Sequence, residues 1–191
     1  VERVAGFDAD VVLLQPRDAL RYGYRLWSEK KTGLVLKLQT LAQDGQVLEQ
    51  VAFSELQLDA LVSKEKLVQM MSRTEGWRVE RSDMVKTGAD AEGWALKRPV
   101  PGFEAVSAYR RPGVDAAGRD AIVQWVFSDG LASVSLFFQP ADRFAGHQEG
   151  HAAEGATHTL RQRLKDAWLT AVGEVPLETL QAFAAALERA R

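Results

Sequence analysis

The segment 123–137, which reads VQWVFSDGLASVSLF, constrains the fold of this chain more than any other part of it. Asp129-Gly130 stands between two runs rich in apolar residues, and Asp-Gly in such a place is the strongest short-range signal of a β-hairpin. A two-residue turn at this dipeptide pairs Phe127 with Ala132, Trp125 with Val134, and Val123 with Leu136. All six side chains are apolar, so the spacing predicts an antiparallel hairpin with one face in a core.

The opposite face of this predicted hairpin is mostly polar, with some apolar side chains among the polar ones. Its members are Ile122, Gln124, Val126, Ser128, Leu131, Ser133, Ser135 and Phe137. The hairpin therefore predicts a sheet, and none of the side chains on this face is typical of a catalytic site.

Residues 2–58 contain apolar-rich runs that are separated by turn signals at regular intervals. The breaks at 16–18, 29–33 and 43–45 contain Pro, Gly and Asp, which is the pattern of an antiparallel meander. Four or so strands with apolar residues on both faces cannot bury themselves, so we expect their sheet to continue in sequence outside this chain or in another chain. A homodimer through the unpaired strands is one arrangement that would satisfy them.

Between residues 59 and 76 the periodicity changes. Leu61, Lys64, Leu67, Val68 and Met71 recur at helical spacing, which predicts a short helix in a linker. We expect residues 77–81 to restart a sheet and residues 86–93 to form a loop.

The last part of the chain predicts further strands and one clear helix. We expect strands at 103–109, 159–164 and 167–172, and a loop over 141–157, which is rich in Gly, Ala and His. Pro176 suits the first helical position, and an apolar stripe follows it. The stripe comprises Leu177, Leu180, Phe183, Ala184 and Leu187. The chain therefore divides into residues 1–58, a linker 59–76, and a sheet-plus-helix domain 77–191, and its class is mainly β with α+β character.

Composition narrows the classes of function. The net charge of −2 argues against bulk attraction to nucleic acid, and no apolar run approaches the ~20 residues that span a bilayer. The absence of cysteine excludes disulfides, thiol nucleophiles and cysteine-based metal sites. Because the chain begins without Met and inside a predicted strand, we expect it to be a fragment or a mature segment.

The histidines are the only cluster typical of a metal site. His147 and His151 have the H-x3-H spacing of a helical zinc site, with His158, Glu149 and Glu154 nearby, but glycines interrupt the segment. We therefore expect a solvated loop there. The sequence also has no phosphate-binding glycine loop and no nucleophile elbow, so we predict no enzyme, no cofactor and no metal.

Two basic groups are better candidates for binding. Arg110 and Arg111 lie at a predicted strand end, while Arg161 and Arg163 alternate along another strand and so share one face. Arginine forks suit carboxylates and phosphates. Charges on an edge strand also protect against aggregation, and both interpretations stay open.

Four aromatic side chains of the N-terminal part are candidates for an apolar ligand cavity. They are Tyr22, Tyr24, Trp27 and Phe53. A curved sheet can place such residues around a lipid, and it can equally place them in an ordinary core.

A family resemblance joins these features. Residues 24–27 (YRLW), 33–34 (GL) and 45–50 (GQVLEQ) resemble the closing strands of the N-terminal domain of MucB/RseB proteins. Residues 101–103 (PGF), 110–112 (RRP), 128–131 (SDGL) and 172–176 (VGEVP) resemble the C-terminal domain of the same family in the same order. The resemblance covers nearly the whole chain, although most of the N-terminal domain is missing from it.

The resemblance implies a fold and a function. The N-terminal part would be a partial, half-open antiparallel β-barrel like that of the lipoprotein carriers LolA and LolB, followed by a smaller sheet with a helix. The function would be regulation of the envelope-stress sigma factor (sigma-E or AlgU) in the periplasm. Such a regulator binds the periplasmic segment of a transmembrane anti-sigma factor, RseA or MucA, shields it from proteolysis, and is released by lipid or lipopolysaccharide signals. The family implies no catalytic residues.

Two functions therefore stay open. As a regulator, the chain would contact the anti-sigma segment through the arginines at 110, 111, 161 and 163 and through the polar hairpin face with Ser128, Leu131 and Ser133. As a periplasmic lipid or lipoprotein carrier, it would bind acyl chains on the strands of residues 2–58 and need no anti-sigma partner.

Overall fold

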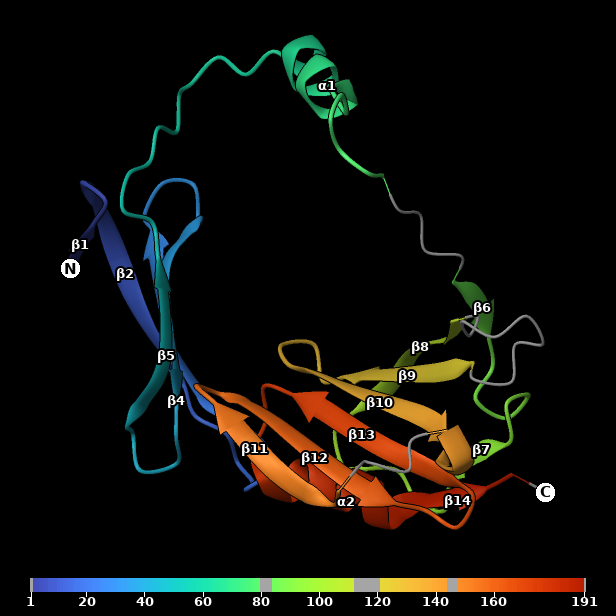
Figure 1. Ribbon diagram of the computed structural model, residues 1–191. Coiled ribbons are helices and arrows are strands. Elements are labelled where there is room, and N and C mark those ends of the chain that lie inside the picture. The colour runs from blue at the N-terminus through green and yellow to red at the C-terminus, as the bar shows by residue number, and fades with distance from the viewer. Residues whose placement is uncertain (1, 80–83, 112–120, 144–147, 191) are drawn as a thin grey trace.

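The computed structural model describes residues 2–79, 84–111, 121–143 and 148–190 (Figure 1). Its strands form an N-terminal and a C-terminal antiparallel sheet, and a long arch of chain that carries helix α1 (Lys64–Ser72) joins the two (Figure 1). The helix predicted between residues 59 and 76 is thus present.

The N-terminal sheet has five strands in chain order. They are β1 (Glu2–Val4), β2 (Phe7–Leu14), β3 (Gly23–Glu29), β4 (Val35–Leu41) and β5 (Val47–Ala52). Gly33 and Gly45 have φ of 75° and 87° in the two turns that flank β4, which explains the glycines at these breaks. The predicted meander is confirmed.

The C-terminal sheet has seven strands in the order β11-β12-β13-β10-β9-β8-β6. Their bounds are β6 (Val85–Thr87), β8 (Glu104–Arg111), β9 (Ile122–Ser128), β10 (Ser133–Pro140), β11 (Gly150–Glu154), β12 (Thr157–Arg163) and β13 (Ala167–Gly173). A short 3-10 helix, η1 (Ala141–Arg143), follows β10. A separate two-stranded sheet of β7 (Trp94–Leu96) and β14 (Leu187–Arg189) packs against the core of the seven-stranded sheet.

Helix α2 (Leu177–Ala186) covers one face of the C-terminal sheet over β12 and β13. Its Phe183 is fully buried and contacts the rings of Phe103 and Phe127 at 5.5 Å and 4.8 Å between centroids. Leu180 is also fully buried. The predicted apolar stripe is therefore the core face of the helix, except that Leu187 begins β14.

The hairpin at 129–130 has a different register from the one we predicted. Ser128 pairs with Ser133 and Phe127 with Val134, so four residues rather than two connect the strands. The Asp129 side chain stabilises the longer loop, because its Oδ1 accepts hydrogen bonds from the backbone N–H of Leu131 (2.9 Å) and Ala132 (2.8 Å). A shift of two keeps each residue on its predicted face.

Two other segments also differ from the prediction. Residues 150–154 of the predicted loop at 141–157 form strand β11, which pairs with β12 through a tight turn at Gly155, with φ of 58°. Residues 77–79 are not a strand, and residues 80 and 81 lie outside the described residues. Of the predicted loop at 86–93, residues 86 and 87 belong to β6, and turns follow.

Direct contacts join the two sheets. Thr179 Oγ1 at the start of α2 donates to the Leu20 carbonyl at 2.7 Å, and the backbone N–H of Ala156 donates to Glu49 Oε1 at 2.9 Å. Tyr22 Oη lies 3.2 Å from Nδ1 of His158, which also contacts the carbonyl of Val175 at 2.8 Å. Thr179 is fully buried, so part of this junction excludes water.

Candidate partner-binding surface

Among the described residues, the side chains on the face of the C-terminal sheet opposite α2 are half-buried or exposed, except that Trp168 is 4% exposed. Successive Cα partners place one row of side chains across this face, because residues directly opposite one another in a sheet share a face. The row is Lys86, Tyr109, Gln124, Phe137, Thr170 and Arg161. We call this surface the open face.

Among the residues that the structure describes, four cations lie on the open face. Arg111 and Arg163 are two residues from members of the row, so they join Lys86 and Arg161 on it. Arg111 donates to Gln124 Oε1 at 3.1 Å, and the Arg163 guanidinium lies 5.5 Å from the Trp168 ring centroid. The buried Nε of Arg161 makes no hydrogen bond within the described part of the chain. Such a surface favours a negatively charged partner.

Arg110 lies on the other face of β8 from Arg111. Its guanidinium nitrogen Nε lies 3.6 Å from Glu92 Oε2, and its side chain is half exposed. The sequence pattern thus placed two neighbouring arginines together, and the strand separates them onto opposite faces.

The N-terminal sheet carries an aliphatic row. Val12 pairs with Leu26, Leu26 with Leu38, and Leu38 with Val51, so four aliphatic side chains lie side by side across β2 to β5. Val51 is 71% exposed and Val12 43%. We call these four residues the aliphatic row. None of the four was among the predicted site residues, although each occupies an alternate position of its strand and the period of two could have identified them.

The hairpin loop 129–132 connects the two surfaces. Leu131 is 69% exposed at its tip. It lines a pocket of about 160 Å³ with Leu14 and Tyr24 of the N-terminal sheet. It also lines a groove of about 400 Å³ on the open face with Ser133 and Phe137. The aliphatic row, Leu131 and the open face therefore follow one another along one side of the molecule, which we call the inner surface.

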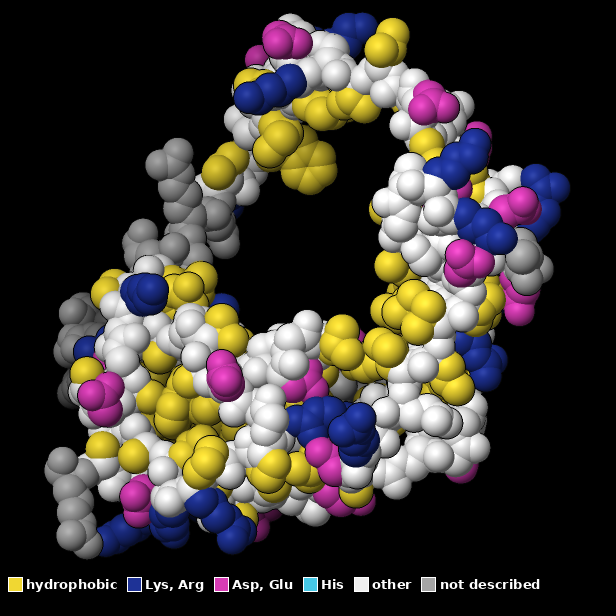
Figure 2. Space-filling view, turned by 180° about the vertical axis from the view of Figure 1, so that it is seen from behind, with side chains coloured by type: hydrophobic (Ala, Val, Ile, Leu, Met, Phe, Trp, Pro, Cys, Tyr) yellow, Lys and Arg dark blue, Asp and Glu magenta, His cyan; other side chains and the backbone are white. Residues whose placement is uncertain are grey.

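Figure 2 shows hydrophobic side chains around the opening enclosed by the N-terminal sheet, the C-terminal sheet and the arch with α1. Exposed apolar residues of the arch contribute to this character. They are Leu61, Val62, Leu67, Val68, Met70, Met71, Trp77 and Val79. An exposed apolar surface of this extent is typical of a protein-binding or lipid-binding region.

The four aromatic candidates do not lie around one cavity. Trp27 is 3% exposed and lies on the opposite face from Tyr24, with its indole N–H donating to Glu2 at 2.7 Å. Tyr24 lies on the same face as the aliphatic row, and burial first, then the nearby Asp129 charge, raise the pKa of its hydroxyl. Tyr22 belongs to the junction between the sheets, and Phe53, 44% exposed, follows β5.

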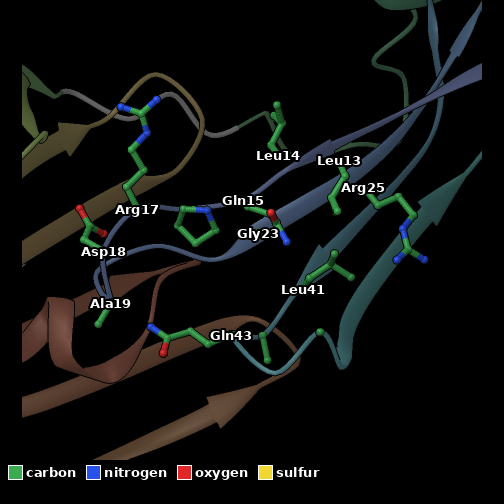
Figure 3. A pocket seen from close by; sticks show the side chains of 13 residues that line it. Leu13, Leu14, Gln15, Arg17, Asp18, Ala19, Gly23, Arg25, Leu41 and Gln43 are labelled. Atoms are coloured by element: carbon green, nitrogen blue, oxygen red, sulfur yellow. The ribbon is translucent and has the colours of Figure 1, made fainter.

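A further hollow lies on the other face of the N-terminal sheet. It has a volume of about 580 Å³ and lies around the connection between β2 and β3 (Figure 3). Arg17 and Arg25 line it at opposite ends in Figure 3, so their guanidinium groups do not converge on one ligand. This hollow lacks the convergent polar groups of a small-molecule site.

The two histidines within the described residues have different surroundings. His151 is exposed on β11, His158 contacts Tyr22 and Val175, and His147 lies outside the described residues. In the described ranges, no three His, Cys, Asp or Glu side chains form a group that could bind a metal ion. Nor does any helix in those ranges combine the length and apolar character that crossing a membrane requires.

Fold and surface together define a protein of two joined antiparallel sheets with an exposed apolar and basic surface. Comparison with known protein families identifies two matches. The family model described as the MucB/RseB N-terminal domain matches residues 1–71, and the model described as the MucB/RseB C-terminal domain matches residues 88–188. The chain belongs to the MucB/RseB family. The expected resemblance and the mainly β fold are both confirmed.

Individual relatives agree with this assignment. The chain is 32% identical over 188 residues to the sigma factor AlgU regulatory protein MucB of Pseudomonas aeruginosa, and 28% identical over 191 residues to the sigma-E factor regulatory protein RseB of Salmonella typhimurium. Each alignment covers 95% of this chain, but only 56% of the MucB sequence and 55% of the RseB sequence. The chain thus covers little more than half the length of these relatives.

Solved structures give the same result. A Pseudomonas aeruginosa MucA/MucB complex matches all of this chain with a TM-score of 0.74 and 30% identity, over 62% of the matched chain. MucB in complex with MucA(peri) matches with a TM-score of 0.73 and 28% identity, over 65% of that chain.

Proposed function

We propose that this chain binds the periplasmic segment of an anti-sigma factor of the RseA/MucA type, shields it from proteolysis, and works in the periplasm. The observation that carries the proposal is the match of the entire chain to MucB solved as a complex with MucA. The sigma-factor regulation in the names of its relatives supports the same role.

The inner surface supplies the contacts in this proposal. Its aliphatic row and Leu131 suit apolar side chains of a segment, while the four cations of the open face suit acidic ones. Ser128 and Ser133 flank Leu131 at the ends of β9 and β10, where they would border the segment.

Isothermal titration of the chain with the periplasmic segment of MucA tests the proposal. We expect saturable binding near one-to-one, and a loss of about tenfold in affinity, or 1.4 kcal/mol, for the double variant Arg161→Glu/Arg163→Glu. The matched control is Lys97→Glu/Arg98→Glu, which makes the same total charge change at two exposed positions of the same domain and should bind as the wild type does. Equal affinity of the double variant and the control would contradict a role for the open face.

Variants of the two arginines at the end of β8, Arg110 and Arg111, distinguish the two faces of the C-terminal sheet. Both remain candidates, and because Arg111 lies on the open face while Arg110 pairs with Glu92 on the other, we expect Arg111→Glu to weaken binding more than Arg110→Glu. Measuring the two variants singly resolves which face the segment contacts.

A second candidate function is that of a lipid or lipoprotein carrier. The aliphatic row favours it, because four exposed or half-buried aliphatic side chains in line suit an acyl chain. Within the regulator proposal, the same row would receive the lipid signal that releases the anti-sigma factor.

A further inference from the structure

Arg21 joins the two sheets more extensively than any other described side chain. It lies in the connection between β2 and β3, and its guanidinium bonds to Asp18 of the same connection. In the C-terminal domain it donates from Nε to Asp129 Oδ2 at 2.9 Å and from Nη2 to the carbonyl of Pro101 at 2.7 Å. Its guanidinium carbon also lies 5.1 Å from the ring centroid of Phe103.

The Asp129 carboxylate has two simultaneous roles. Its Oδ1 accepts from the backbone of Leu131 and Ala132 and so shapes the hairpin loop, while its Oδ2 accepts from Arg21. The Asp129 side chain is only 7% exposed, and that of Arg21 is 22% exposed. Charge-assisted hydrogen bonds are stronger than neutral ones, and removing Arg21 would leave the largely buried Asp129 carboxylate without its compensating charge. The loop that presents Leu131 is therefore bonded directly to the N-terminal sheet.

Gly102 makes room for this arrangement. It has φ of +78°, and a Cβ at this position would lie 1.8 Å from Nη2 of Arg21. Because that atom is the end of a flexible side chain, an added methyl group would displace the guanidinium. The positive φ favours glycine at position 102, and the absence of a Cβ there leaves the space that Nη2 of Arg21 occupies.

We propose that Arg21 is a positioning residue for partner binding: it fixes the angle between the two sheets and the shape of loop 129–132, so that the aliphatic row and the open face act on one continuous segment. This inference rests on the proposed function. The other junction contacts, through Thr179, Tyr22 and Glu49, keep the sheets attached without Arg21. Loss of Arg21 therefore widens the range of angles between the two sheets and does not separate the domains.

Two measurements on the full chain test this role. Because the chain has no cysteine, the pair Lys31→Cys and Lys165→Cys gives one spin label in each sheet domain, and pulsed electron resonance reports their distance distribution. We expect a single narrow distribution for the parent, a broad one for Arg21→Gln, and an intermediate one for Arg21→Lys. Titration with the MucA periplasmic segment should show a loss of about tenfold for Arg21→Gln, within the usual range of coupling between linked sites.

Gly102→Ala and Arg17→Gln complete the design. Gly102→Ala should displace the guanidinium from the other side of the contact and so broaden the distance distribution and weaken binding as Arg21→Gln does, with an added loss of stability because alanine is strained at a φ of +78°. Arg17→Gln changes an exposed arginine of the same connection and should match the parent in both measurements. If the parent binds the segment and Arg21→Gln binds equally well, the positioning role is wrong while the proposed function stands. If the parent does not bind, the proposed function fails, and the role in partner binding fails with it.

Discussion

At the scale of single residues, Glu29 is a buried carboxylate whose hydrogen bonds should make the stability of the fold depend on pH. It is 6% exposed, and its Oε2 accepts from the backbone of Lys31 (3.0 Å) and from both the N–H and the hydroxyl of Thr32 (2.7 Å each). The hydrogen bonds from Thr32 lower the pKa of Glu29 below its ordinary 4.5. A lowered folded-state pKa means that the unfolded chain binds the proton more tightly, so this stabilisation is complete above about pH 4.5 and is lost as the pH falls through the folded pKa.

The variant Glu29→Gln tests this dependence. We expect it to unfold at a lower temperature than the wild type near neutral pH, and the difference to shrink as the pH falls below about 4.5. Thermal unfolding followed by circular dichroism at several pH values measures both. Glu75→Gln, at an exposed position, is the control and should follow the wild type throughout. A constant difference between Glu29→Gln and wild type at every pH would contradict the assignment.

The residue types in the sequence indicated which aromatic and charged side chains make contacts, but not which partners they contact. Tyr24 and Trp27 are three residues apart on one strand, and the period of two already places them on opposite faces, against a shared cavity. The partners of Arg21 were not predictable, because Asp129 lies 108 residues away and only the assembled junction brings them together.

At the scale of elements, the two helices should behave differently. Helix α1 has nine residues, none of them buried, and is stabilised by its Ser63 cap, whereas α2 buries Thr179, Leu180, Phe183 and Ala186. Isolated helices shorter than ~12 residues are marginal in water. We therefore expect amides of α1 to exchange with solvent at least ~100-fold faster than those of α2 in hydrogen-exchange mass spectrometry. Equal protection would mean that the apolar side of α1 is covered in solution.

The helices and strands also show most clearly what could and could not be predicted from the sequence. The meander, the 129–130 hairpin and α2 follow from local patterns, and all three are present. Strand β11 was missed because its Gly- and Ala-rich sequence has low strand propensity and depends on pairing with β12. The hairpin register differed because the Asp129 side chain, rather than backbone dihedrals alone, determines the loop.

At the scale of the whole molecule, the proposed contacts for a partner segment and for an acyl chain lie on the same inner surface. If a segment covers the aliphatic row and the open face together, an acyl chain on the row should weaken binding of the segment by competition. We expect a single-chain lysophospholipid, kept below its micelle concentration, to lower the apparent affinity for the MucA periplasmic segment. The double variant Val12→Glu/Val51→Glu places charges at two exposed positions of the row and should abolish this lipid effect. Lipid that binds without changing the affinity for the segment would favour the carrier function instead, and an equal effect on wild type and variant would place the lipid outside the aliphatic row.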